Sequence, residues 1–92
     1  SATKAALNGL TLSLARELGR TGTTVNAILP GFIETDMSSG LNSKQLSQIL
    51  RRTPIGKLAE KSEISSLVEY LLSENASSIT GQLIKIDGGN TV

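Results

Sequence analysis

The chain has 92 residues, 38% of them hydrophobic and 18% charged, and its 9 basic and 8 acidic side chains leave a formal net charge of +1. This composition excludes a disordered charged tail, and a charge so near zero gives no electrostatic footprint for nucleic acid. Because the sequence has no cysteine and no histidine, it lacks disulfides and the commonest metal ligands, and we expect no metal site. No apolar run approaches the roughly 20 residues that a membrane-spanning helix needs, and residues 1–4 carry no signal-peptide pattern, so no membrane association is expected.

The first expected element is a helix. Leucines recur at intervals of three and four residues, at Leu7, Leu10, Leu14 and Leu18. One apolar stripe of this kind predicts a helix over about residues 1–20, ended by Gly19 and Gly22. The alanines and Gly9 in this segment are small, which favours a close approach to a sheet or to another helix.

A strand is expected next, over Thr23–Leu29. The segment is rich in β-branched residues and nearly all apolar after Thr24, which is typical of a strand buried on both faces of a parallel sheet. Pro30 and Gly31 end the strand, because proline cannot continue the hydrogen-bonded ladder inside a sheet.

Residues 32–57 are expected to form a long, mostly polar connection that contains one helix. Asn42 or Ser43 could cap this helix, and Leu46 and Ile49 contribute to a narrow apolar face. A long excursion beyond the C-terminal end of a strand is often functional.

A second amphipathic helix and a last strand complete the pattern. The helix is predicted over Ser62–Glu74 with Ser62 as its N-cap, and the strand over Gln82–Ile86, followed by a turn at residues 87–89. The apolar residues assigned to packing are Leu7, Leu10, Leu14, Val25, Ile28, Ile64, Leu67, Val68, Leu71, Ile84 and Ile86.

The order helix, strand, helix, helix, strand indicates that residues 1–92 are a segment of a single α/β domain. A strand joined to the next strand through helices implies parallel pairing with a right-handed crossover. Two parallel strands do not make a stable sheet by themselves, and parallel sheets need cover on both faces. We therefore expect one end of a larger α/β domain, with its other strands before Ser1.

Four segments resemble a known family when taken in order. They read SATKAA at residues 1–6, VNAILPGFIETDM at 25–37, ITGQ at 79–82 and IDGG at 86–89. Together they are similar to the C-terminal part of the short-chain dehydrogenases/reductases, and within that family to the 3-oxoacyl-acyl-carrier-protein reductases. The resemblance covers the whole chain and implies the C-terminal portion of a Rossmann-like, doubly wound parallel sheet.

The resemblance also implies roles for single residues. Lys4 matches the lysine of the family's Tyr-x-x-x-Lys motif, which binds the nicotinamide ribose hydroxyls and lowers the pKa of the tyrosine through its charge. That tyrosine would stand immediately before Ser1, and the catalytic serine and the glycine-rich phosphate turn further upstream, so these residues alone would be inactive. Contacts with the cofactor, NADP or alternatively NAD, are implied for Lys4, Pro30, Gly31, Ile33 and Thr35.

The same resemblance implies a substrate lid at about residues 36–57. Its apolar members are Met37, Leu41, Leu46 and Ile49. The implied reaction is the NADPH-dependent reduction of a 3-oxoacyl thioester to its 3-hydroxyacyl form in fatty acid synthesis, on acyl carrier protein or coenzyme A. A homotetramer in the cytoplasm, or alternatively in an organelle matrix, is implied as well.

Other interpretations stay open. A second interpretation is another dehydrogenase of the family, acting on a sugar, a steroid or a small alcohol, because the lid over residues 37–53 sets this choice and its sequence is poorly diagnostic. A non-catalytic chain that serves as an oligomerisation surface is a third hypothesis. Without the family resemblance, the local sequence favours simpler interpretations. Lys4 is then a solvated lysine, Pro30-Gly31 ends a strand, and Thr35-Asp36 forms a turn or a helix cap. The basic residues Arg51, Arg52, Lys57 and Lys61 form either a solvated face or a surface for an acidic carrier protein.

Overall fold

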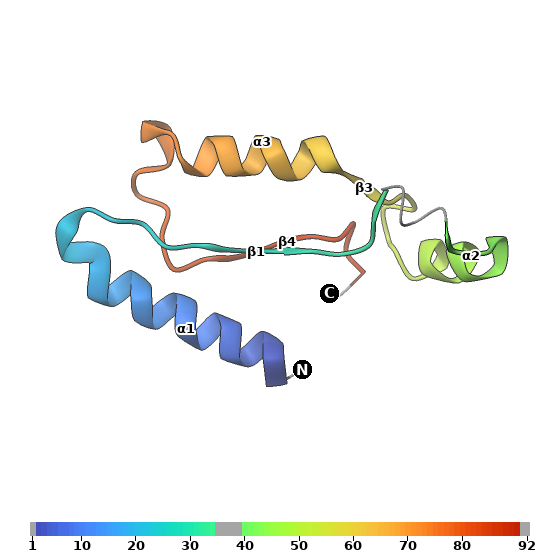
Figure 1. Cartoon of the computed structure of the whole chain (residues 1–92), viewed down its shortest axis with the longest axis horizontal. Coiled ribbons are helices and arrows are strands. Elements are labelled where there is room, and N and C mark those ends of the chain that lie inside the picture. The colour runs from blue at the N-terminus through green and yellow to red at the C-terminus, as the bar shows by residue number, and fades with distance from the viewer. Residues whose placement is uncertain (1, 35–39, 91–92) are drawn as a thin grey trace. The chain divides into compact units, whose positions relative to one another are not determined.

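The computed structural model describes residues 2–34 and 40–90. Thr35 and Met37, for which site roles are predicted, lie outside the described residues. The chain divides into two compact units: the first is Ser1–Ile28 with Val68–Ile84, and the second is Leu29–Leu67 with Lys85–Val92. Figure 1 shows the elements coloured in chain order.

The first unit opens on helix α1, Ala2–Leu18, which continues as the 3-10 helix η1, Gly19–Thr21. This confirms the helix predicted over residues 1–20. The helix ends at Gly22, which adopts a left-handed φ of 79° and whose N–H donates to the Gly19 carbonyl oxygen at 3.0 Å. A glycine is favoured there because it has no Cβ to clash in this conformation.

The buried face of α1 consists of small residues rather than leucines. Thr11 and Ala15 are buried, whereas Leu10 is 58% exposed, so the prediction that Leu10 packs in the core is wrong. A Cβ added at Gly81 would lie 3.6 Å from the Cβ of Ala15. The short side chains therefore bring α1 close to this backbone, as the small residues of the segment predicted, and Leu10 lies on another side of the helix.

The central strand pair is parallel, as predicted. Its strands are β1, Ala27–Pro30, and β4, Leu83–Ile86. The Ala27 N–H donates to the Gln82 carbonyl oxygen at 2.8 Å, and the Gly31 N–H donates to the Ile86 carbonyl oxygen at 2.9 Å. Because these bonds advance in the same direction along both segments, the strands run parallel.

Strand β1 begins later than predicted, because a polar side chain takes over the pairing at Asn26. Its amide oxygen accepts the Gln82 N–H at 3.1 Å, and its amide nitrogen donates to the Ile79 carbonyl oxygen at 3.0 Å. These bonds replace a regular ladder over the first residues of the predicted strand. Most of β1 is half-buried, so the burial on both faces that its composition indicated is not reached within this chain.

Helix α3, Lys61–Leu71, confirms most of the helix predicted over residues 62–74, but it ends three residues earlier, and the 3-10 helix η3, Glu74–Ala76, follows after a break. The prediction of Ser62 as N-cap is wrong, because α3 begins one residue earlier. The carboxylate of Glu63 accepts the Glu60 N–H at 2.6 Å. A glutamate three residues into a helix that binds back in this way satisfies one of the free N–H groups at the helix start.

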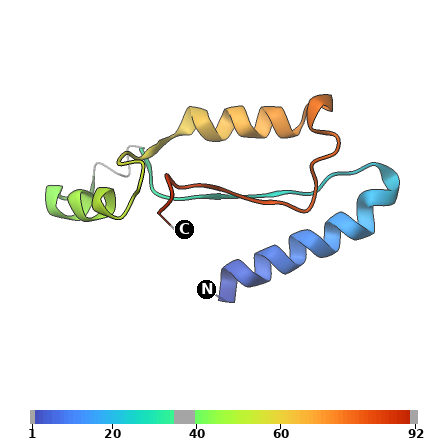
Figure 2. The same ribbon diagram turned by 180° about the vertical axis from the view of Figure 1, so that it is seen from behind.

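Within the first unit, α1 and the C-terminal part of α3 lie on opposite sides of the strand segments (Figures 1 and 2). A hollow of about 200 Å³ separates the end of α3 from one strand face, and its lining residues are Thr24, Asn26, Ile28, Val68, Leu71 and Leu72. Thr24, Asn26 and Ile28 are spaced two residues apart, as expected for one face of the extended segment that leads into β1. Val68 is 37% exposed beside this hollow, so its assignment to the core is also wrong.

The second unit contains a short strand pair that the sequence did not predict. Strand β2, Ile33–Glu34, pairs in parallel with β3, Ala59–Glu60, with Ile33 opposite Ala59. Between them lies α2, Ser43–Arg51, which is the helix predicted inside the long connection.

Asn42 rather than Ser43 caps α2. The Asn42 side-chain oxygen accepts the Gln45 N–H at 2.8 Å, and the Gln45 side-chain oxygen accepts the Asn42 N–H at 3.0 Å. This reciprocal capping box satisfies two backbone donors and fixes the start of the helix.

The hydrophobic residues that are fully buried in the described part of the chain are all alanines, namely Ala15, Ala59 and Ala76. The other residues assigned to packing are half-buried, apart from Leu10 and Val68. In the ranges 2–34 and 40–90, no helix is both long and apolar enough to cross a bilayer.

Candidate functional site

The site begins where β1 ends, in the second unit. Pro30 is the last residue of the strand, and the Gly31 N–H continues the pairing by binding the Ile86 carbonyl oxygen at 2.9 Å. A Cβ added at Gly31 would lie 2.7 Å from the Cβ of Asp87 and 3.0 Å from its Cα. The two segments therefore touch backbone to backbone, at the edge of the sheet where parallel strands commonly bind ligands.

The turn after β4 forms the neighbouring wall. Asp87 is buried, its carboxylate oxygen accepts the Gly89 N–H at 2.9 Å, and its carbonyl oxygen accepts the Asn90 N–H at 3.1 Å. Gly88 and Gly89 have φ values of 63° and 91°, which only glycine adopts readily. These features confirm the predicted turn at residues 87–89 and fix the backbone position of Asn90.

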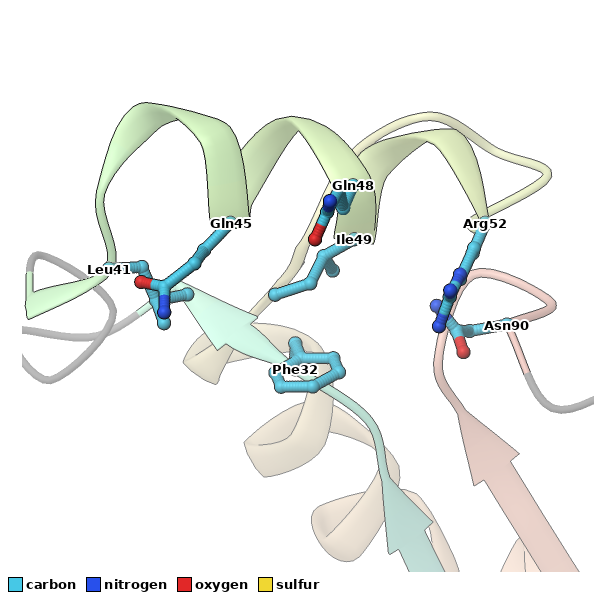
Figure 3. A pocket seen from close by; sticks show the side chains of 7 residues that line it. All are labelled: Phe32, Leu41, Gln45, Gln48, Ile49, Arg52 and Asn90. Carbon is cyan, nitrogen blue, oxygen red and sulfur yellow. The ribbon is translucent and has the colours of Figure 1, made fainter.

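A pocket of about 320 Å³ lies between this turn and helix α2 (Figure 3). Its lining residues are Phe32, Leu41, Gln45, Gln48, Ile49, Arg52 and Asn90. Phe32 lies below Ile49 in Figure 3, and Arg52 reaches from the end of α2 toward Asn90. The pocket thus combines an apolar floor with amide groups and one guanidinium, a composition typical of small-molecule sites.

A second hollow, of about 310 Å³, adjoins the first. Pro30, Gly31, Phe32 and Asn90 line it, so Phe32 and Asn90 border both spaces. Two hollows with shared lining residues therefore lie at the C-terminal end of a parallel strand, where such sheets commonly bind ligands.

Thr53 connects α2 to the wall of the pocket. Its hydroxyl donates to the Ile49 carbonyl oxygen at 2.7 Å and accepts the side-chain amide of Asn90 at 3.0 Å. Thr53 is only 5% exposed, so both bonds are partly shielded from bulk water.

The second unit brings several predicted site residues together. Leu41 and Ile49 line the pocket, and Pro30 and Gly31 line the adjoining hollow. Ile33 lies next to them in β2. Leu46 is on a different surface of α2, where it lines a separate hollow with Leu50 and Arg51.

Lys4 belongs to the first unit. It is half-buried in the first turn of α1 and takes part in interactions there. The basic residues grouped in the sequence also differ in their surroundings, because Arg52 lines the pocket and Arg51 lines the separate hollow.

From the sequence, no site role was assigned to four polar or aromatic residues of the pocket, namely Phe32, Gln45, Gln48 and Asn90. The spacing of Gln45 and Gln48 with Leu41 and Ile49 could have placed the glutamines on the same helix face. No local pattern could have indicated Asn90, because its position depends on strand pairing far along the chain.

Comparisons with known proteins identify the family. The family model described as enoyl-(acyl carrier protein) reductase matches residues 1–91. The chain is 45% identical over 89 residues to the 3-oxoacyl-acyl-carrier-protein reductase FabG of Vibrio cholerae. These aligned residues make up 97% of this chain and 36% of that protein. The chain therefore spans about a third of the length of such curated relatives.

Solved structures agree with this fold. The 3-oxoacyl-acyl-carrier-protein reductase of Brucella melitensis is 35% identical, with a TM-score of 0.92 over 99% of this chain and 34% of that one. A 4-hydroxyisoleucine dehydrogenase complexed with NADH is 38% identical, with a TM-score of 0.87 over 98% of this chain and 38% of that one.

The chain belongs to the short-chain dehydrogenase/reductase family, a family of oxidoreductases, and its relatives include 3-oxoacyl-acyl-carrier-protein reductases. This confirms the family predicted from the four sequence segments. It also confirms the fold class, an α/β fold that forms part of a Rossmann-like parallel sheet.

Proposed function

We propose that these residues form part of an NADPH-dependent reductase that converts a 3-oxoacyl thioester, carried on acyl carrier protein or coenzyme A, to the 3-hydroxyacyl form. The observation that supports this most is the pair of adjoining hollows that share Phe32 and Asn90, in a chain 45% identical to a FabG reductase. One hollow would take the cofactor ring and the other the substrate.

The residues at the second hollow, beside Pro30 and Gly31, suit a nicotinamide ring. Pro30 and Gly31 offer a flat, mostly apolar surface beside the Asn90 amide, which is the kind of wall that a planar ring with a carboxamide needs. We assign cofactor contacts to Lys4, Pro30, Gly31, Ile33 and Thr35. When bound, the cofactor supplies the hydride. NADP is the proposed form, and NAD is the alternative because a dehydrogenase relative is complexed with NADH.

Lys4 would hold the ribose hydroxyls of the cofactor. Its positive charge would also favour the ionised form of a neighbouring tyrosine, which protonates the substrate oxygen. The segment of about residues 36–57 would act as the substrate lid, with Met37, Leu41, Leu46 and Ile49 as its apolar members. A homotetramer, located in the cytoplasm or in an organelle matrix, completes the proposal.

A second candidate is a dehydrogenase for a sugar, a steroid or a small alcohol. The polar wall of Gln45, Gln48 and Arg52 supports it, because amides and a guanidinium bind hydroxyl or carboxylate groups well. A non-catalytic role as an oligomerisation surface is the remaining alternative.

One assay separates these three functions. The natural protein that carries these residues would be given acetoacetyl thioester with NADPH, and separately a panel of alcohols with NAD. Oxidation of NADPH by the thioester supports the reductase, and turnover of an alcohol alone favours the second candidate. Absence of turnover with every substrate, in a folded preparation, contradicts both enzymatic functions.

The role of Lys4 has its own test. Replacing the ammonium group by an apolar chain of similar length, Lys4→Met, is expected to lower kcat/KM by about 100-fold or more, because both cofactor binding and proton transfer lose their cation. Lys85 is an exposed lysine on β4 and provides the matched control. Lys85→Met should leave the rate within about twofold of the unaltered protein, and equal losses in both variants would contradict the assignment.

A further inference from the structure

The hydrogen bonds at Thr53 have a fixed direction. A threonine hydroxyl has one proton to donate and two lone pairs to accept. Thr53 donates its proton to the Ile49 carbonyl oxygen at 2.7 Å, in the last turn of α2, where the same oxygen also accepts the Arg52 N–H at 3.1 Å. Toward Asn90 the hydroxyl is therefore an acceptor only.

This direction determines how the Asn90 amide is turned. The side-chain nitrogen must face Thr53, and it donates to the hydroxyl oxygen at 3.0 Å. The side-chain oxygen of Asn90 and the second amide proton then face other directions. Since Asn90 lines both hollows, these two groups are the polar groups that it can offer there.

The backbones on both sides of this bond are held independently of it. The Ile55 N–H donates to the Gly88 carbonyl oxygen at 3.1 Å. A Cβ added at Gly88 would lie 2.6 Å from the Thr53 methyl carbon, and one added at Gly89 would lie 3.0 Å from Pro54. Loss of the Thr53 hydroxyl alone would therefore free the Asn90 side chain without separating the two segments.

We propose that Thr53 and Asn90 form a positioning pair, in which the Thr53 hydroxyl holds the Asn90 amide in one orientation at the wall of the pocket. Arg52 and Asn90 then make a polar end that takes a hydrogen-bonding carbonyl or amide group of the substrate, opposite the apolar contacts of Phe32 and Ile49. The inference rests on the proposed reductase function and specifies which residues select its substrate.

Two nearly isosteric variants test the pair in the natural protein. Thr53→Val removes the hydroxyl and keeps the branched shape, and Asn90→Leu removes the donating amide nitrogen and keeps the size of the side chain. Each is expected to raise the KM for acetoacetyl thioester about tenfold with kcat unchanged, because the contact contributes equally to substrate and transition-state binding. The KM of the double variant should be no higher than that of the single variants, because both substitutions remove the same hydrogen bond.

Two controls separate positioning from folding. Thr53→Ser keeps the hydroxyl and should retain the original KM within about twofold. Thr11 makes the same bond to a carbonyl four residues earlier, at 2.7 Å, and is 4% exposed, but it lies in α1 of the first unit. Thr11→Val should leave the KM unchanged while it weakens α1.

Hydrogen exchange gives a readout that does not depend on turnover. In Thr53→Val and in Asn90→Leu, peptides that cover residues 50–56 and 87–90 should exchange faster by the same factor, whereas Thr11→Val should not alter them. Additive effects on KM, or a KM that stays unchanged although exchange rises, would overturn the proposal. If the unaltered protein turns over no thioester, the proposed function fails, and unequal or independent changes in exchange would then overturn the pair as well.

Discussion

The close approach of Gly31 to Asp87 leaves no space for a side chain at the end of β1. A Cβ at Gly31 would lie 2.7 Å from the Asp87 Cβ and 3.0 Å from its Cα, and neither atom can move by rotating a side-chain bond. The backbone would have to shift, and this would disturb the hydrogen bond from the Gly31 N–H to the Ile86 carbonyl oxygen. We expect Gly31→Ala to lower the free energy of unfolding by about 1–3 kcal/mol, measured by urea denaturation of the natural protein.

A glycine in open space provides the control for this variant. Gly9 lies inside α1, and a Cβ added there would meet nothing within 4 Å. Gly9→Ala is expected to raise the free energy of unfolding by about 0.5–1 kcal/mol, because alanine costs less backbone entropy in a helix. A loss at Gly9 equal to that at Gly31 would show that the contact with Asp87 does not decide the effect.

For single residues, the sequence predicted where they lie along the secondary structure but not which residues they contact. Pro30 is the last residue of β1 rather than the first residue after it, because the N–H groups of Ala27 and Gly31, and not position 30, pair with β4. The contact of Gly31 with Asp87, and that of Thr53 with Asn90, depend on the register between segments far apart in the chain. Local patterns do not carry that information, so Asn90 was not a predicted site residue.

The capping box of α2 determines where the helix at the pocket begins. Asn42→Ala removes the side-chain oxygen that accepts the Gln45 N–H at 2.8 Å. We expect a loss of about 1 kcal/mol, confined to α2 and measured as faster hydrogen exchange over residues 43–48. Ser43 was the other candidate cap and is exposed, so Ser43→Ala should leave that exchange unchanged. The opposite ranking of the two variants would contradict the assigned cap.

Long elements were predicted better than short ones, for a physical reason. Helices α1, α2 and α3 have repeating apolar positions, and several residues support each prediction. The pair β2–β3 consists of two-residue strands, Ile33–Glu34 and Ala59–Glu60, which are too short to show a periodic pattern. The start of α3 was misplaced by one residue because Glu63 reaches back to Glu60, a bond that competes with capping by Ser62.

For the molecule as a whole, the sequence correctly indicated a parallel strand pair that needs more cover than the chain supplies. The leucine stripe of α1 predicted its helical period but not the burial of Leu10, since burial depends on what lies against each face. Leu72 is 83% exposed and Ile55 is 67% exposed, although both are large and apolar. The exposure of these two side chains agrees with the inference from the sequence that further strands or helices are needed to cover the apolar surfaces.

Residues 1–92 expressed alone should therefore fail to fold cooperatively. The buried apolar side chains of the described part are alanines, which remove little area from water, and the β1–β4 pair has only two strands. Both outer edges of that pair would be unpaired, which favours association of one chain with another. We expect a broad thermal transition, strong binding of a hydrophobic dye and aggregation at micromolar concentration.

The decisive comparison is between these residues alone and the natural protein under the same conditions. If apolar surface on α1, α3 and the strand pair is covered only in the natural protein, dye binding should be strong for the isolated residues and weak for that protein. Calorimetry should then show a sharp transition for the natural protein alone. A sharp transition of the isolated residues at a similar temperature would mean that the half-buried leucines and isoleucines pack far better in solution than their exposure indicates, and that the chain needs no further strands to fold.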